Sequence, residues 1–171
     1  MKRTLLAANE SLLFLCTSMY LGTGWSLLLF SFPIAPQLTI DNYYLYFVPS
    51  VAAATHFFTY MTQVMIAACL VMAVAQWQTR FRWVPIVVLL SVVAATALTI
   101  VVIFPLNDEM SRGITDPARL RTVLDTWMML NRLRVELWTV QWLSMMIYFA
   151  WRAVGSESPA VLTLHPVGEG A

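Results

Sequence analysis

The sequence predicts an all-α integral membrane protein, folded as an antiparallel four-helix bundle with an extended fourth helix. Hydrophobic residues make up 60% of the 171 residues and charged residues only 11%, whereas charged residues approach about a quarter of an average soluble domain. A helix needs roughly 20 apolar residues to cross a bilayer, and four segments qualify as spans in this chain. They cover residues 11–32, 47–75, 83–104 and 117–153.

The first segment is interpreted as an uncleaved span. Lys2 and Arg3 precede it, as in a secretory signal, but Glu10 interrupts the approach and no clean small-residue cleavage site follows. Gly22 and Gly24 lack side chains that would keep a neighbouring helix at a distance. We therefore expect another helix to approach the first span closely at these two residues.

The second and third segments are joined by the short connection 76–82, which predicts a tight turn between neighbouring helices. Pro105 follows the third segment and cannot easily continue a helix. Asn107 can turn the chain by bonding to its own backbone, which would make this region an exit cap. Alternatively, Asn107 points back into the mouth of the bundle, and the sequence leaves both interpretations open.

The fourth segment has a clear start, because Asp116 is a good N-cap and Pro117 suits the first helical position. A helix from there to Ala153 would be roughly 55 Å long, more than the hydrocarbon core requires. Its first half should therefore project as an amphipathic extension over the bundle mouth. Residues 1–155 form one transmembrane domain in this interpretation, and residues 156–171 a flexible tail.

Positive charges suggest an orientation in the cell (inner) membrane with a cytoplasmic N-terminus. With that orientation, one set of basic residues shares the cytoplasmic side: Lys2, Arg3, Arg80, Arg82 and Arg152. A second set around the third connection argues for the opposite orientation: Arg112, Arg119, Arg121, Arg132 and Arg134. Of these, Arg132 is expected to pair at the surface with Glu136 or Asp125.

A polar stripe on the fourth segment is the leading candidate site. Steps of four, three, four and three residues place five side chains on one helix face: Trp127, Asn131, Arg134, Trp138 and Gln141. An arginine close to hydrocarbon is costly unless it faces protein, water or a ligand. Arg134 and Asn131 would bind the polar part of a ligand, and the tryptophans would wall its ring. The alternative is that Arg134 pairs with an acid while the tryptophans anchor the membrane interface.

His56 is the second candidate, since an intramembrane histidine can act as a general base or proton relay. Thr59, Tyr60 and Gln63 are expected on the same side of its helix, with Tyr60 and Gln63 as ligand contacts. A hydrogen-bonded structural histidine is the competing interpretation. One histidine does not make a metal site, so neither a metal nor a cofactor is expected. A net charge of +1 gives no reason to expect nucleic-acid binding.

A third span ending in Pro-x-Asn, a loop, and then Trp-x-x-x-His-x-x-Arg at the start of the last span form the pattern of the anthrone oxygenase-like family of small four-span membrane proteins, which this sequence resembles. Here the pattern is Pro105-Leu106-Asn107 and then Trp127 to Arg134. The resemblance implies a relative of cofactor-independent monooxygenases that convert a phenolic anthrone to a quinone. The family usually carries histidine where this chain has Asn131, and an asparagine cannot accept a proton at neutral pH.

The leading hypothesis is a membrane protein with a cavity at one membrane face that binds a small lipophilic or aromatic molecule. In its catalytic version Arg134 and Asn107 stabilise an oxyanion and His56 takes the proton. The alternative is a non-enzymatic accessory or structural subunit that docks a partner through the fourth helix. The partner would be another membrane protein or a second copy of the chain in a homo-oligomer. A transporter or channel is a third possibility, although no inverted repeat is visible.

Overall fold

The computed structural model of the protein describes residues 2–156, which contain helices and no strand. The elements in chain order are α1 (Lys2–Ser26), the π-helix η1 (Leu27–Ser31), the 3₁₀ turn η2 (Ala35–Gln37), α2 (Tyr43–Gln76), α3 (Trp83–Leu98), the π-helix η3 (Thr99–Ile103), α4 (Phe104–Arg112) and α5 (Pro117–Ser156). The flexible tail expected at residues 156–171 lies, except for Ser156, outside the described residues.

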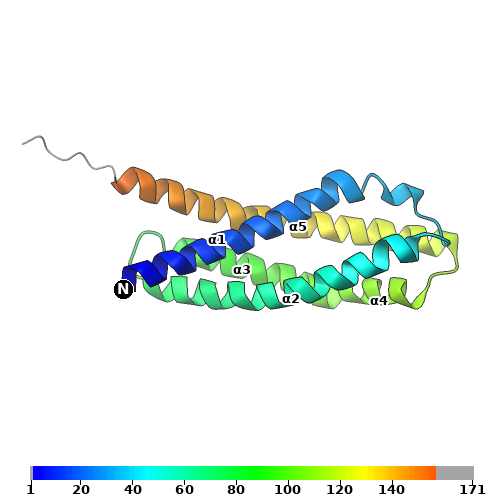
Figure 1. The fold of residues 1–171 in the computed structure, drawn as a ribbon, viewed down its shortest axis with the longest axis horizontal. Coiled ribbons are helices and arrows are strands. Elements are labelled where there is room, and N and C mark those ends of the chain that lie inside the picture. The colour runs from blue at the N-terminus through cyan, green and yellow to red at the C-terminus, as the bar shows by residue number, and fades with distance from the viewer. Residues whose placement is uncertain (1, 157–171) are drawn as a thin grey trace, which may run out of the picture.

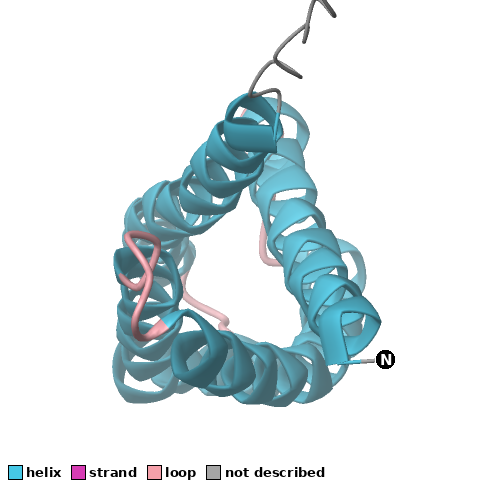
Figure 2. Cartoon of the chain, turned by 90° about the vertical axis from the view of Figure 1, so that its left-hand side faces the viewer, coloured by secondary structure: helices cyan, strands magenta, loops and turns pink. Residues whose placement is uncertain are grey.

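The long helices lie side by side along the longest axis of the molecule (Figure 1). Helix α5 packs against α1 and α3, and α2 packs against the same two helices. The four therefore form a ring in the order α1, α2, α3, α5, and Figure 2 shows them surrounding one central axis. The start of α1 lies beside the end of α2, where Asn9 Nδ2 donates to the Ala68 carbonyl at 3.0 Å.

Three helical stretches are long and apolar enough to cross a membrane: 2–31, 43–76 and 83–112. Each overlaps with one of the first three spans expected from the sequence, which supports an integral membrane protein. Helix α5 is 40 residues long and has a polar inner face, and it is not among these three stretches.

The third helical stretch does not end before Pro105, contrary to the exit-cap interpretation. It passes through η3 and continues as α4 to Arg112, with Pro105 in the first turn of α4. In a first turn the missing proline amide removes no necessary hydrogen bond, and the π-helix absorbs the change in register. Asn107 consequently lies on a helix rather than in a turn, and its side chain can be aimed at a neighbouring helix.

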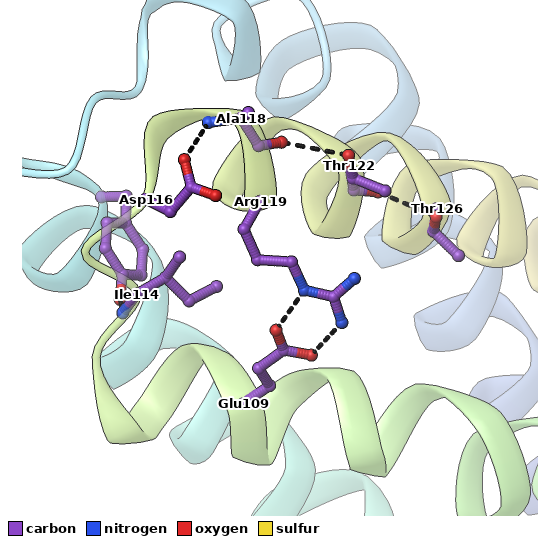
Figure 3. Close-up of polar contacts among 8 residues, drawn as sticks. Glu109, Ile114, Asp116, Ala118, Arg119, Thr122 and Thr126 are labelled. Atoms are coloured by element: carbon purple, nitrogen blue, oxygen red, sulfur yellow. Dashed lines mark hydrogen bonds and ion pairs between the residues drawn. The ribbon is translucent and has the colours of Figure 1, made fainter.

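Helix α5 begins where the sequence predicts, at Pro117. Asp116 Oδ1 accepts a hydrogen bond from the Ala118 amide at 3.0 Å, as an N-cap should (Figure 3). In the same view Arg119 reaches across to Glu109 on α4, and its two N–H groups donate at 2.6 and 2.7 Å. This bidentate pair fixes the start of α5 to α4.

One of the two glycines of α1 permits the close approach that was expected. A Cβ atom at Gly24 would lie 2.7 Å from Trp138 Cε3 and 2.8 Å from Val135 Cγ2, so α5 comes against the backbone there. At Gly22 a Cβ atom would meet nothing within 4 Å, so the prediction was wrong for this residue. The contact at Gly24 decides how deeply Trp138 sits between the helices.

Candidate ligand-binding cavity

A cavity of about 560 Å³ lies inside the ring of helices, within the range of roughly 300–1,000 Å³ typical of small-molecule sites. It lies between two apolar cores. Tyr20 and Met65 border it from the core nearer the start of α1. Ile103 and Trp127 border it from the core nearer the α4–α5 connection. All the long helices contribute walls, so the cavity is central to the fold.

The polar stripe of α5 faces this cavity, as the sequence pattern predicted. All five of its members line it: Trp127, Asn131, Arg134, Trp138 and Gln141. Two further predicted site residues line it from other helices, namely Asn107 from α4 and Gln63 from α2. Residues far apart in the chain are thus gathered around one space.

Arg134 has no carboxylate partner within residues 2–156. The ion pairs among residues 2–156 are Glu109–Arg119, Arg121–Asp125 and Glu10–Arg152. Arg134 instead donates from one terminal nitrogen to Asn131 Oδ1 at 3.1 Å, and its Cζ lies 4.6 Å from the centre of the Trp138 ring. Its buried Nε has no hydrogen-bond partner. The alternative in which Arg134 pairs with an acid is therefore not what the structure shows.

Asn131 is held in place by the residues around Trp127. Its Nδ2 donates to the Trp127 carbonyl at 2.8 Å, and Trp127 Nε1 donates to Asn107 Oδ1 at 2.9 Å. Because the amide nitrogen of Asn131 is engaged by a carbonyl, its oxygen is the atom turned towards Arg134. This chain of bonds from α4 to α5 positions the guanidinium at the cavity wall.

The two tryptophans are surrounded by protein rather than free to stack on a ligand. Trp138 is only 3% exposed, and its ring centre lies 4.9 Å from that of Tyr20 and 6.3 Å from that of Phe58, in addition to its contact with Arg134. Trp127 meets Phe47 edge to face at 4.7 Å. We conclude that Trp138 supports Arg134 and that Trp127 anchors Asn107.

Gln141 lies two helical turns from Arg134 on the same face and is 1% exposed. Its side-chain oxygen has no hydrogen-bond partner. Leaving a buried acceptor unsatisfied costs about 1–3 kcal/mol. Arg134 and Gln141 carry the buried side-chain atoms of residues 2–156 that lack a partner, and both residues line the same cavity.

Threonines form a polar wall that the sequence reading largely missed. Their hydroxyls donate to carbonyls one turn earlier, at 2.7–2.8 Å, and so expose oxygen lone pairs. The threonines that make these bonds and line the cavity are Thr59, Thr62, Thr96 and Thr99. Their near-helical spacing on two apolar spans was the signal in the sequence that pointed to a shared face.

Both π-helices border the cavity, through Leu27 and Ser31 of η1 and through Thr99, Ile100 and Ile103 of η3. A π-turn widens the helix locally and occurs frequently at functional sites. No sequence pattern that we know of predicts a π-turn, so this feature came from the structure alone.

His56 and Tyr60 do not reach the cavity, contrary to the sequence-based expectation. Both side chains are exposed on the outer face of α2 and contact each other edge to face at 5.2 Å. Each successive residue of a helix is rotated by about 100°, so Thr55 and Thr59 face inward while His56 turns away. No Asp, Glu or His lines the cavity in the described part of the chain.

Thr59 and Gln63 of α2 and Ile100 of η3 line the cavity and are also exposed, which indicates a sideways opening between these two elements. The neighbouring seam between α1 and α2 is closed at this level, because the Tyr20 hydroxyl and Thr62 Oγ1 lie 2.6 Å apart in a hydrogen bond. A molecule in the surrounding phase would therefore reach the cavity past Thr59.

The charged residues considered for partner docking lie outside the cavity. Arg121 pairs with Asp125 on the exposed surface of α5 at 3.1 Å. Arg132 contacts neither Glu136 nor Asp125 in an ion pair, contrary to expectation, and instead lies 6.0 Å from the centre of the Phe32 ring. Arg132 is exposed and only two residues from Arg134, which makes it a matched control for variants of the cavity.

Comparison with known proteins adds no relative. No family model matches the chain, and neither a curated protein nor a solved structure is significantly similar to it. The resemblance to the anthrone oxygenase-like family therefore rests on the sequence pattern alone.

Proposed function

We propose that this integral membrane protein binds a small lipophilic, aromatic molecule that carries an oxygen acceptor for Arg134. The observation that carries the proposal is a half-buried arginine at the wall of a cavity of about 560 Å³, whose Nε is buried and which has no carboxylate partner within residues 2–156. In this proposal the chain forms an antiparallel four-helix membrane bundle. Helix α5 is its fourth crossing, and the first half of α5 extends beyond the membrane.

The energetic argument concerns the uncompensated cation. Taking a guanidinium out of water is expensive, and its neutral contact with Asn131 recovers only part of the lost hydration. A phenolate, enolate or polarised carbonyl at Arg134 would make charge-assisted hydrogen bonds, which are about twice as strong as neutral ones. Apolar residues dominate the rest of the walls, so the remainder of the ligand should be hydrophobic.

Oxygenase activity of the anthrone type would be an extension of this binding function. Arg134 and Asn107 would then stabilise the oxyanion of an anthrone-like substrate. Because His56 lies outside the cavity and no acid or histidine lines it among the described residues, a substrate would have to arrive already ionised. We therefore propose binding as the function, and retain oxygenation only for substrates acidic enough to ionise in water.

The proposal is tested with purified protein in lipid nanodiscs and dihydroxyanthrone as the probe, with quenching of tryptophan fluorescence reporting binding. Arg134→Leu should weaken binding at least tenfold, the equivalent of about 1.4 kcal/mol. Arg134→Lys should also weaken it, since lysine cannot reproduce the planar fork of donors. Arg132→Leu is the matched control and should bind like the wild type. Equal binding by wild type and Arg134→Leu would overturn the proposal, and quinone formation by the wild type would support the oxygenase extension.

The same proposal places the N-terminus in the cytoplasm of an inner membrane. Its support is the positive set formed by Lys2, Arg3, Arg80, Arg82 and Arg152. Arg152 contacts Glu10 of α1, and α2 ends beside them at Gln76, so these charges share one end of the bundle. A cysteine introduced at Arg80 should react with an impermeant maleimide only after the membrane is opened. If the maleimide labels this cysteine in intact cells, then the N-terminus lies outside the cytoplasm and the proposed orientation is wrong.

A further inference from the structure

We propose that Gln141 is a second polar anchor, so that the ligand is a two-ended aromatic molecule with a hydroxyl group about two helical turns from the oxygen bound by Arg134. This inference rests on the proposed function and narrows it to a ligand class, namely elongated diphenols and their hydroxy-ketone equivalents.

Gln141 has unused hydrogen-bonding capacity inside the cavity. This amide is buried to 1% exposure, lines the cavity, and has a side-chain oxygen without a partner. A ligand hydroxyl can donate to that oxygen. If the amide is turned over, the same hydroxyl can accept from the amide nitrogen. A hydroxyl is thus the group that satisfies Gln141 in either orientation, whereas an ether or a carbonyl satisfies only one.

The separation of the two anchors along α5 sets the length of the ligand. Arg134 and Gln141 are seven residues apart on one face of α5, which is about 10 Å along a helix at 1.5 Å per residue. Trp138 lies between them, but its ring is covered by Arg134, Tyr20 and Phe58. A ligand that meets both anchors must therefore extend along the threonine wall formed by α2 and α3, past Thr62 and Thr96.

The walls between the two anchors are apolar or weakly polar. Thr62 and Thr96 donate their hydroxyl protons to their own helices, and the Thr62 oxygen also accepts from the Tyr20 hydroxyl, so both offer the cavity only weak acceptors. Between the anchors the walls also include Met65, Ile66 and Val92. Such walls suit an aromatic framework, and they provide no charged group in the described residues to hold a second ionised end. The end at Gln141 should accordingly be a neutral hydroxyl.

The experiment uses three redox-inert probes with wild-type protein in nanodiscs and subtracts partitioning measured with empty nanodiscs. They are para,para′-biphenol, its monomethyl ether, and para-phenylphenol, which has a single oxygen. We expect isothermal titration calorimetry to show biphenol binding at least tenfold more tightly than either of the others. This comparison needs no variant, so it cannot fail through misfolding.

Gln141→Met, which keeps a similar length and shape, should erase the preference for biphenol while leaving the affinity for para-phenylphenol unchanged. Arg132→Leu is the control, since Arg132 is exposed and does not line the cavity, and it should keep the preference. Arg134→Leu should weaken all three probes together.

The outcomes separate this inference from the proposed function. If the wild type binds all three probes equally and Arg134→Leu weakens them, then water rather than ligand satisfies Gln141 and the two-ended ligand is refuted, while the binding function stands. If no phenol binds, both are overturned. A preference for biphenol that survives in Gln141→Met would also refute the role of Gln141.

Discussion

The inner face of α5 carries two buried polar sites whose bonding differs. Beyond Gln141 the same face continues to Tyr148 and Arg152, which meet Glu10 of α1. Glu10 is 1% exposed and accepts hydrogen bonds from Tyr148, Arg152 and, at 3.1 Å, Gln76 Nε2. We call this set the Glu10 cluster. In the Arg134 cavity, by contrast, the described part of the chain provides no carboxylate for the cation, and two buried side-chain atoms have no hydrogen-bond partner there.

This difference in bonding indicates that Glu10 has a structural role, whereas Arg134 does not. In the Glu10 cluster the carboxylate is neutralised by Arg152, and its oxygens are bonded to groups from α2 and α5. A satisfied network of this kind ties helices together and has no capacity left for a ligand. The Arg134 cavity has the reverse character, because it has space and unfulfilled bonding capacity. Replacing the arginine by leucine should therefore lower the free energy of unfolding in the Glu10 cluster, but mainly lower ligand affinity in the Arg134 cavity.

The largest effect is expected for Arg152→Leu, which leaves a buried carboxylate without its cation. Breaking a fully buried pair costs about 3–5 kcal/mol, but the Arg152 side chain is 48% exposed and Tyr148 and Gln76 still donate to Glu10. We expect the free energy of unfolding to fall by about 2 kcal/mol. Reversible unfolding in mixed micelles measures it, and an unchanged stability would show that the Glu10 cluster is not a structural tie.

Gly24→Ala should have the next largest effect and sharpen the contrast, because it perturbs only one of the two sites. The new methyl group would press on Trp138 and Val135, which lie 2.7–2.8 Å from its position, and such overpacking costs about 1–3 kcal/mol. Since Trp138 supports Arg134, ligand affinity should fall as well. Gly22→Ala is the matched control, as its Cβ meets nothing within 4 Å. Equal effects of the two changes would remove the special role of Gly24.

Arg134→Leu is expected to change stability least among the charge variants, by no more than about 1 kcal/mol in either direction. It removes one hydrogen bond to Asn131 and one cation–π contact, but it also removes the cost of burying an uncompensated cation. Sites that sacrifice stability for binding commonly respond in this way. The same unfolding assay measures the change, and a loss as large as that of Arg152→Leu would mean that Arg134 is a structural group after all.

The extent of sequence-based prediction differs between these two sites for a physical reason. The α5 stripe was visible because a helix places residues three and four apart on one face, and this rule needs no partner. The Glu10 cluster was missed because Glu10 lies 66 and 142 residues from Gln76 and Arg152. Nothing local connects them, so Glu10 was treated only as an interruption of the first span.

The same limit explains the errors over His56 and Pro105. The sequence placed His56 on a membrane helix but could not say which face of that helix turned inward, because every face of α2 is rich in apolar or small residues. Pro105 is an ordinary helix breaker unless a π-turn has just shifted the register, and η3 does so here. Both outcomes depend on tertiary packing, which local patterns do not specify.

The smallest equilibrium effect is expected at the side opening, which distinguishes a cavity that exchanges ligand from a closed cluster. Thr59 is exposed at the opening between α2 and η3, and within residues 2–156 its hydroxyl donates to the Thr55 carbonyl of its own helix. Thr59→Trp should obstruct the opening and slow association and dissociation of dihydroxyanthrone by a similar factor, on the order of tenfold, leaving Kd nearly unchanged. Stopped-flow fluorescence measures both rates.

Tyr60→Trp is the control for this measurement, because Tyr60 lies next to Thr59 but on the outer face of α2, away from the cavity. It adds a tryptophan to the same helix without obstructing the opening, so both rates should stay at wild-type values. If Thr59→Trp instead weakens Kd while the association rate is unchanged, then Thr59 contacts the bound ligand and access follows another route. The mouth beside Ser31 and Ser50, which also line the cavity and are exposed, would then be the entrance.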